Sequence, residues 1–216
     1  MIPKITILHI INNFGRGGAE TMLISVLKEL KEYNNIVVTL CEENKFDNNL
    51  QCDKYFCLNL KSIYFLPFKI FKLRSIIKAN RVDIVHSHLF WPIFAARFAT
   101  PKRIALITTI HTSVAYARDY KKWIIRFLDR FSYNLRNNII IAVANGPLKQ
   151  YFETLKIKPY KTHVLYNFAD TAMFNIAESA THNPEQVFKI ITIGTLRYPK
   201  NHKYLISAFE KLKMLP

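Results

Sequence analysis

The chain has few of the features that crosslink small secreted proteins or that cross membranes. Its 216 residues include only three cysteines, and Cys41, Cys52 and Cys57 lack Cys-x-x-Cys spacing, which argues against a disulfide framework and a cysteine zinc site. The apolar stretches 90–99 and 139–144 are too short, or too interrupted, to cross a bilayer, which takes about 20 residues. The N-terminus does not have the pattern of a signal peptide. We therefore expect a cytoplasmic protein.

Acidic residues are also scarce, and the positive charge gathers near aromatic side chains. The chain has 15 Asp and Glu residues and 31 Lys and Arg residues, which gives a net charge of +16. In the segment 116–136 an apolar stripe lies among cations, and its candidate surface residues are Lys121, Lys122, Trp123, Arg126 and Arg130. The segment 61–74 repeats the pattern. Such segments suit an anionic membrane surface.

Two other interpretations of these basic segments are open. Both apolar stripes could bury against the body of the protein while the cations face water. Nucleic acid could use the same charge, but neither segment contains a motif that reads DNA or RNA, so we expect no nucleic-acid partner. The membrane interpretation predicts a protein on the cytoplasmic face of the membrane.

Glycine is rare, yet three of the five glycines lie in positions 15–18. They follow an apolar run at 5–11 that is typical of a buried strand and precede a helical pattern at 19–32. At such a turn in an α/β sheet, free N–H groups and a helix N-terminus favour anions, which points to a phosphorylated ligand near Gly17 and Gly18. The alternative is a tight turn that merely needs positive φ.

The same turn tests for a dinucleotide site. Gly15 and Gly17 fit the spacing G-x-G-x-x-G, but Glu20 occupies the third position, where a carboxylate would repel pyrophosphate. A nicotinamide-dependent oxidoreductase therefore remains only as an alternative.

Strand-like and helix-like segments alternate through most of the chain, which predicts an α/β fold with a doubly wound, Rossmann-like parallel sheet. The expected strands cover 5–11, 36–40, 55–58, 82–85, 104–110, 139–143 and 163–165, and the expected helices cover 19–32, 67–79, 90–98, 120–135 and 147–155. We expect one domain at 1–168, a polar linker at 169–186, and at 187–216 the first strand (187–193) and helix (202–214) of an incomplete second domain.

Histidines supply the next candidates. His86 and His88 share one face of a strand and His111 follows another, at the sheet edge that also holds the glycine turn. A metal would need a third ligand, and none is evident, so we expect no metal site. His111, flanked by threonines, is the better candidate for chemistry, because an imidazole can polarise sugar hydroxyls or phosphate. The remaining histidines show no comparable grouping.

Five motifs in order resemble the N-terminal half of retaining glycosyltransferases of family 4, which have the GT-B fold. They are Gly17-Gly18-Ala19-Glu20, Asp83-Ile84-Val85-His86-Ser87-His88, Thr109-Ile110-His111-Thr112, Tyr166-Asn167-Phe168-Ala169-Asp170, and the stretch 193–201 with Gly194 and Lys200.

The resemblance implies transfer of a sugar from a nucleotide-sugar donor to a lipid-linked or saccharide acceptor in envelope polysaccharide synthesis, such as lipopolysaccharide, without a cofactor or metal. It implies that His111 is catalytic and contacts the transferred sugar. Gly17, Gly18 and Lys200 would approach the donor phosphates. It places Glu20, His86, His88 and Asn167 on the acceptor side or in loops.

The chain also departs from the family pattern. Thr195 stands where the family often has arginine, and no two glutamates lie eight positions apart as they do in the family's second domain. We therefore expect a truncated enzyme with little activity alone and, as one partner, a separately encoded C-terminal half. The alternative is a non-catalytic module that binds a membrane or a partner.

Overall fold

The computed structural model describes residues 4–15, 17–45, 50–114, 117, 119–168, 190–194, 196 and 200–212. The chain divides into two compact units, Met1–Asp170 and Thr171–Pro216. Each unit is considered by itself below. The expected linker at 169–186 lies outside the described residues.

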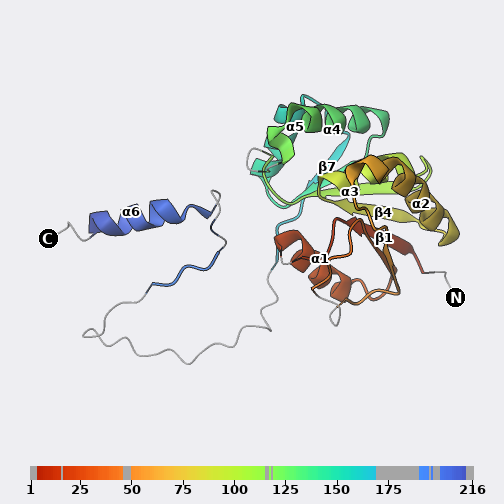
Figure 1. Ribbon diagram of the computed structural model, residues 1–216, viewed down its shortest axis with the longest axis horizontal. Coiled ribbons are helices and arrows are strands. Elements are labelled where there is room, and N and C mark those ends of the chain that lie inside the picture. Colours follow the sequence, from red (N-terminus) through yellow and green to blue (C-terminus); the bar gives the residue numbers. More distant parts are fainter. Residues whose placement is uncertain are drawn as a thin grey trace. The chain divides into compact units, whose positions relative to one another are not determined.

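The first unit is built on a seven-stranded parallel sheet with the order β3-β2-β1-β4-β5-β6-β7 (Figure 1). The strands are β1 (Thr6–Ile11), β2 (Asn34–Thr39), β3 (Lys54–Cys57), β4 (Ile84–His88), β5 (Ala105–Ile110), β6 (Ile139–Ala142) and β7 (Lys161–Val164). This confirms the predicted doubly wound sheet. Strand order reverses between the neighbours β1 and β4, which is where such sheets bind ligands, outside the carboxyl ends of the strands.

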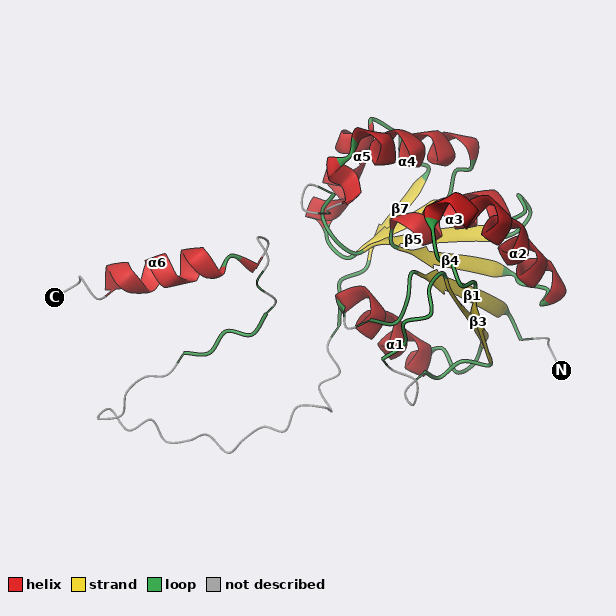
Figure 2. Ribbon diagram, viewed as in Figure 1, coloured by secondary structure: helices red, strands yellow, loops and turns green. Residues whose placement is uncertain are grey.

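Helices cover both faces of the sheet, with α1 on one face and α2, α3, α4 and α5 in a layer on the other (Figure 2). Their bounds are α1 (Gly18–Glu29), α2 (Leu66–Ala79), α3 (Phe90–Ala99), α4 (Trp123–Leu135) and α5 (Asn145–Leu155), with short 3-10 turns η2 (Ile63–Phe65) and η3 (Asp119–Lys121). Because side chains alternate across a strand, Leu8 and Ile10 of β1 pack in the cluster with α2 and α3, whereas Ile11 packs with Leu23 and Leu27 of α1.

The inward side of helix α4 carries both polar and apolar residues, and its outward side is aromatic. Its buried residues are Ile125, Asp129, Ser132 and Tyr133. The exposed side chains form a stripe one turn apart, with Trp123 70%, Phe127 54%, Phe131 48% and Leu135 54% exposed. The interpretation that this apolar stripe buries against the protein is therefore wrong, because a buried polar network already occupies the inner face of α4.

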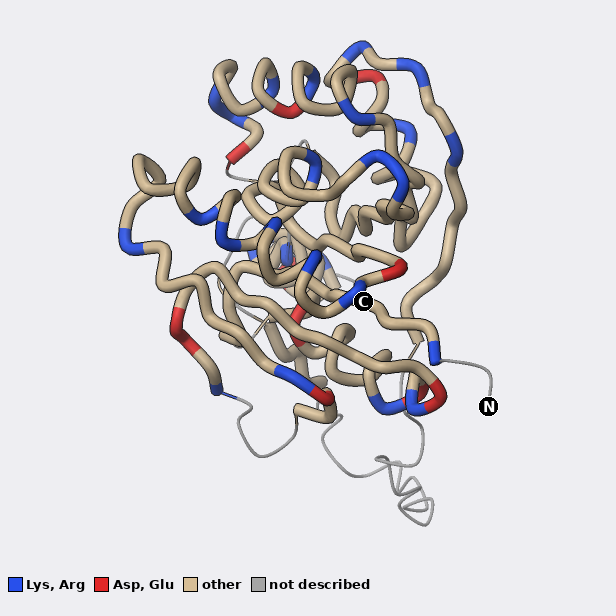
Figure 3. Tube along the Cα trace, turned by 90° about the vertical axis from the view of Figure 1, so that its right-hand side faces the viewer, with Lys and Arg blue, Asp and Glu red and all other residues tan. Residues whose placement is uncertain are grey.

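The second basic segment, η2 and α2, shows the same exposure of aromatic side chains. Leu66, Leu73, Ile76 and Ile77 face the core, while the exposed aromatics are Tyr64, Phe65, Phe68 and Phe71. Helix α2 packs beside α3, and α3 packs beside α4, so both basic segments belong to one helical layer. Figure 3 shows Lys and Arg distributed along the chain, with few Asp and Glu between them.

A buried ion pair holds that layer together. Arg97 of α3 forms a salt bridge with Asp129 of α4, and both side chains are almost fully buried. Arg97 also donates to the Tyr151 hydroxyl of α5 over 3.0 Å and to Ser132 Oγ over 2.9 Å. The Tyr120 hydroxyl donates to the second carboxylate oxygen of Asp129. A buried charge pair is stable only when further hydrogen bonds satisfy its remaining atoms, and this one is surrounded by them.

The network shows in the ionisation of its members. Burial opposes the charge of Arg97, yet Tyr151 and Asp129 hold the pKa of the guanidinium above its ordinary value. Burial, together with the charge of Asp129, raises the pKa of the Tyr120 and Tyr151 hydroxyls, so both stay protonated donors.

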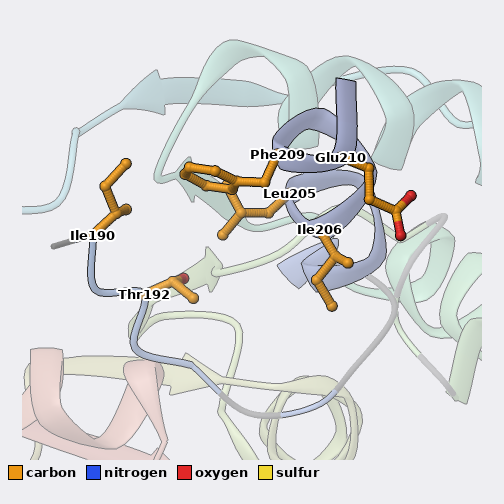
Figure 4. A pocket seen from close by; sticks show the side chains of 6 residues that line it. All are labelled: Ile190, Thr192, Leu205, Ile206, Phe209 and Glu210. Atoms are coloured by element: carbon orange, nitrogen blue, oxygen red, sulfur yellow. The ribbon is translucent and has the colours of Figure 1, made fainter. Parts of the chain in front are cut away.

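The second unit contains the helix α6 (His202–Leu212), in agreement with the helix expected at 202–214. The strand expected at 187–193 is not observed in its described part, 190–193, because no neighbouring strand pairs with it there. Ile190 and Thr192 instead lie beside α6 and, with Leu205, Phe209 and two further residues, line a cavity of about 440 Å³ (Figure 4).

Replacing Asp129 by Asn should lower the free energy of unfolding of the chain by about 3 kcal/mol, because Arg97 would keep a buried charge without its counter-ion. The measurement is urea unfolding followed by circular dichroism. Glu153→Gln is the matched control, since Glu153 pairs with Lys149 at 3.8 Å on the exposed surface of α5, and such pairs contribute about 0.5 kcal/mol. Equal effects of the two substitutions would contradict the role of the buried pair.

Candidate active site

Side chains of three neighbouring strands gather at the carboxyl edge of the sheet. In the parallel register His9 of β1 lies beside His86 of β4, and His88 of β4 lies beside Thr109 of β5. Residues two apart on a strand share a face, so His9, His86, His88 and Thr109 point to the same side, and His111 follows two residues after Thr109. The structure thus brings together the three predicted histidines and adds His9.

Hydrogen bonds and ring contacts connect this histidine cluster (His9, His86, His88 and His111). His88 Nδ1 lies 2.9 Å from His111 Nε2, and His86 Nε2 lies 2.7 Å from Thr109 Oγ1. The ring centroids of His86 and His88 are 4.2 Å apart, and those of His9 and His86 are 5.4 Å apart. The catalytic candidate His111 is therefore held in place through His88.

The rings of the cluster are neutral at physiological pH. Burial lowers the pKa of His9 and of His111 to about 4. Burial also lowers the pKa of His86 and His88 well below the ordinary value, and the neighbouring rings lower it further. A neutral imidazole keeps one lone pair, so each ring can accept a hydrogen bond or a metal as well as donate.

No pattern in the sequence indicates that His9 belongs to this group, and the expectation that it lacks such neighbours is wrong. His9 and His86 lie 77 positions apart along the chain, and only the pairing of β1 with β4 makes them neighbours. The order of strands in a doubly wound sheet is the one signal that could have suggested the contact.

A cavity of about 130 Å³ opens at the same edge. It is lined by Asn12 after β1, by Leu89 and Phe90 where β4 leads into α3, by His111 after β5, and by neighbours that include Asp119 and Tyr120. It is a mixed pocket, with aromatic walls and a few polar groups, as is typical of small-molecule sites. Sequence reasoning found His111 but not the residues that form the walls.

One wall residue has a strained backbone. Leu89 has φ 69° and ψ 159°, a region that glycine almost alone adopts. It directly follows His88 and precedes the first residue of α3. Such outliers persist where the surrounding structure enforces them and are common at ligand sites, so this turn supports the cavity as a functional site.

The glycine turn is not the tight turn with positive φ that is the alternative to a ligand site. Gly17 is the N-cap of α1 in an extended conformation, with φ −139° and ψ 166°, and none of the described glycines has positive φ. A Cβ on Gly17 would instead collide with the carboxylate of Glu20, whereas Gly18 faces open space. Burial raises the pKa of Glu20, and the nearby Glu43 raises it further. The carboxylate of Glu20 thus lies at the N-terminus of α1, where an anionic ligand would bind.

The glycosyltransferase family 4 model matches residues 16–173, nearly three quarters of the chain. The chain belongs to glycosyltransferase family 4. The matched residues include α1, the histidines of β4, His111 and the cavity walls of α3, so the site described above lies mostly within the family domain. The sheet corresponds to that of the N-terminal domain of GT-B glycosyltransferases.

Two curated relatives and one solved structure illustrate the likeness. The Campylobacter jejuni N-acetylgalactosamine-N,N'-diacetylbacillosaminyl-diphospho-undecaprenol 4-alpha-N-acetylgalactosaminyltransferase is 24% identical over 94% of this chain and 58% of its own length. The Staphylococcus aureus capsular polysaccharide biosynthesis glycosyltransferase CapH is 25% identical over 97% of this chain and 58% of its own. The crystal structure of Anabaena HepE in complex with UDP and glucose superposes with a TM-score of 0.64, at 15% identity, over 80% of this chain and 47% of that one.

The family 4 chain spans a little over half the length of these curated relatives. Within the part that the structure describes, no helix is long and apolar enough to cross a membrane. The family assignment leaves the oxidoreductase alternative without support, since the dinucleotide fingerprint was already broken at Glu20.

The remaining site candidates lie elsewhere. Asn167 is exposed and follows β7. Strand β7 is the outermost strand on its side of the sheet, and β5 and β6 lie between it and β4. Lys200 belongs to the second unit. The surface candidates Lys121, Lys122, Trp123, Arg126 and Arg130 are all exposed on η3, on α4 or between them. The donor-phosphate role of Gly17, Gly18 and Lys200 therefore stays a prediction.

Alanine at the two glycines of the α1 turn should have opposite effects. Gly18→Ala should raise the free energy of unfolding by about 0.5 kcal/mol, because Gly18 is helical and its Cβ would meet nothing. Gly17→Ala should lower it by about 1 kcal/mol, since alanine is a poor N-cap and its Cβ would displace Glu20. Chemical unfolding of both variants measures the difference. A stabilising Gly17→Ala would contradict the packing of Glu20 over the turn.

Proposed function

We propose that this family 4 chain takes part in transferring a sugar from a nucleotide-sugar donor to a lipid-linked or saccharide acceptor in envelope polysaccharide synthesis. The observation that carries the proposal is the cavity lined by His111 at the carboxyl edge, within the residues matched by the family. The two curated relatives support the substrate class, since one name specifies a diphospho-undecaprenol acceptor and the other a capsular polysaccharide.

Glycosyl transfer depends mainly on stabilising the charges that develop in the transition state. Glycosyl transfer builds positive charge on the sugar ring and negative charge on the departing phosphate, so dipoles and cations near the phosphate lower the barrier. In the proposal the N-terminus of α1 at Gly17 and Gly18 serves the phosphate. The ammonium of Lys200, in the second unit, is a separate candidate for the same role. His111 is neutral at physiological pH and hydrogen bonds a hydroxyl of the transferred sugar, with retention at the anomeric carbon.

The second wall of the active cleft is part of the same proposal. Transfer needs donor and acceptor held together, and misplacement by about 1 Å can cost about 100-fold in rate. We accordingly propose that a C-terminal half, such as the curated relatives have beyond the part matched here, holds the donor's base and ribose, and that supplying one raises the rate of transfer.

His111→Ala should lower transfer by about 100-fold or more, because the variant loses a group that contacts the reacting sugar. The assay follows label from a panel of UDP-sugars into undecaprenyl-diphosphate-linked acceptors, using the chain with and without a C-terminal half taken from a relative. His163→Ala is the control, since His163 is exposed on β7. Transfer that is unchanged in His111→Ala would reject the assigned role. If no protein tested, with or without the C-terminal half, transfers label to any acceptor, a non-catalytic module would be favoured instead.

We also propose that the helical layer rests on an anionic membrane surface, where lipid-linked acceptors reside. Trp123, Phe127 and Phe131 form an exposed stripe, in which the rings of Phe127 and Phe131 stack with their centroids 6.2 Å apart. Lys122, Arg126 and Arg130 repeat at the same four-residue spacing directly beside it and are exposed. Aromatic side chains next to cations fit the interface of an anionic bilayer.

The double substitution Phe127→Ser, Phe131→Ser should weaken binding to vesicles of phosphatidylglycerol by about 10-fold or more, because each serine removes buried apolar area at the interface. Sedimentation with vesicles measures it, and uncharged phosphatidylcholine vesicles should bind poorly in every case. Tyr160→Ser is the matched control, since Tyr160 is exposed outside the two basic segments. Equal losses in both variants would contradict docking through α4.

A further inference from the structure

Three of the clustered histidines have the arrangement of a metal site. His86 and His88 come from one strand and His9 from its parallel neighbour, and each offers one ring nitrogen such that the three atoms lie within 4.8 Å of one another. His9 and His88 are fully buried, and His86 is half-buried.

Two of the ring nitrogens have no protein partner. His9 Nδ1 and His88 Nε2 are buried and make no hydrogen bond. Leaving a buried polar atom without a partner is costly, so something other than protein is expected to satisfy a pair of such atoms in one cluster.

The hydrogen bonds around His9 fix where its proton lies. Asn35 Nδ2 donates to the carbonyls of Leu30 and Tyr33, over 2.7 Å and 3.3 Å, so Asn35 Oδ1 is the atom turned toward His9 Nε2, 3.4 Å away. An amide oxygen can only accept, and His9 therefore carries its proton on Nε2. The bare lone pair on Nδ1 is the form of imidazole that binds a metal.

We propose that His9, His86 and His88 bind a divalent transition-metal ion, Zn²⁺ in the first instance, with the fourth position left to water. Three histidines and an open position form a known donor set for zinc. Zn–N bonds of about 2.1 Å at tetrahedral angles place the nitrogens about 3.4 Å apart, so the proposal requires the three rings to move slightly closer together when the ion binds. This inference does not rest on the proposed sugar transfer.

The surrounding contacts fit the role of outer partners of a metal site. Metal-binding histidines usually donate their other ring N–H to a nearby acceptor, which fixes the tautomer. His9 already does so toward Asn35. With zinc on Nε2, His88 carries its proton on Nδ1 and donates it to His111 Nε2, so that the ion sets the tautomer of His111 through one hydrogen bond.

The test titrates the chelator-treated chain with Co²⁺ and with Zn²⁺. The expected result is one ion per chain, with the visible absorption of four-coordinate Co²⁺, displaced by Zn²⁺. His9→Gln and His88→Gln should each weaken binding by about 100-fold or more, since a lost ligand should cost at least as much as a lost outer partner. His163→Gln should leave it unchanged, and His111→Gln should weaken it by about 10-fold.

Circular dichroism of each variant shows whether it folds, and the titration of the unaltered chain decides the proposal even if a variant does not. A folded chain that binds no stoichiometric Co²⁺ or Zn²⁺ would overturn it and would leave a buried water as the partner of the two nitrogens. Binding that survives in folded His9→Gln and His88→Gln would overturn it as well.

Discussion

The buried pair between Arg97 and Asp129 is the interaction on which the rest of the first unit depends. It links α3 and α4, and through the Tyr151 hydroxyl it reaches α5. The same carboxylate accepts a hydrogen bond from Tyr120, which lines the cavity with Phe90. A buried charge tolerates little displacement of its partner. The pair therefore holds Tyr120, on one wall of the cavity, in a fixed position relative to β5, the strand that precedes His111.

The pair also explains why α4 faces outward with its aromatic side. The side of α4 that packs inward carries Asp129 and Ser132, which bind Arg97, beside Ile125 and Tyr133. The aromatic stripe lies on the opposite side as a consequence. Exposed aromatic side chains on a helix of a soluble domain generally mark an interaction site.

The sequence allowed the strands and helices to be predicted because their hydrophobic periods are strong and the turns are short. It also allowed His86, His88 and His111 to be placed at one edge, since parallel strands share their carboxyl ends. It could not reveal the inward side of α4, because a stripe of aromatic residues at helical spacing normally faces the core. Nor could it reveal His9, whose neighbours come from a distant strand, or the strained backbone of Leu89, which depends on the packing of α3.

The reversal of strand order between β1 and β4 explains why the histidines and the cavity lie at one edge of the sheet. Neighbouring crossovers leave in opposite directions there, so no helix fills the space directly beyond the strand ends. Asn12 after β1 and His111 after β5 reach one cavity across β4 because of it. The buried rings beneath stay neutral at physiological pH, so each keeps a lone pair for a hydrogen bond or a metal ion. The cluster in turn holds His111 in place, through the contact between His88 Nδ1 and His111 Nε2.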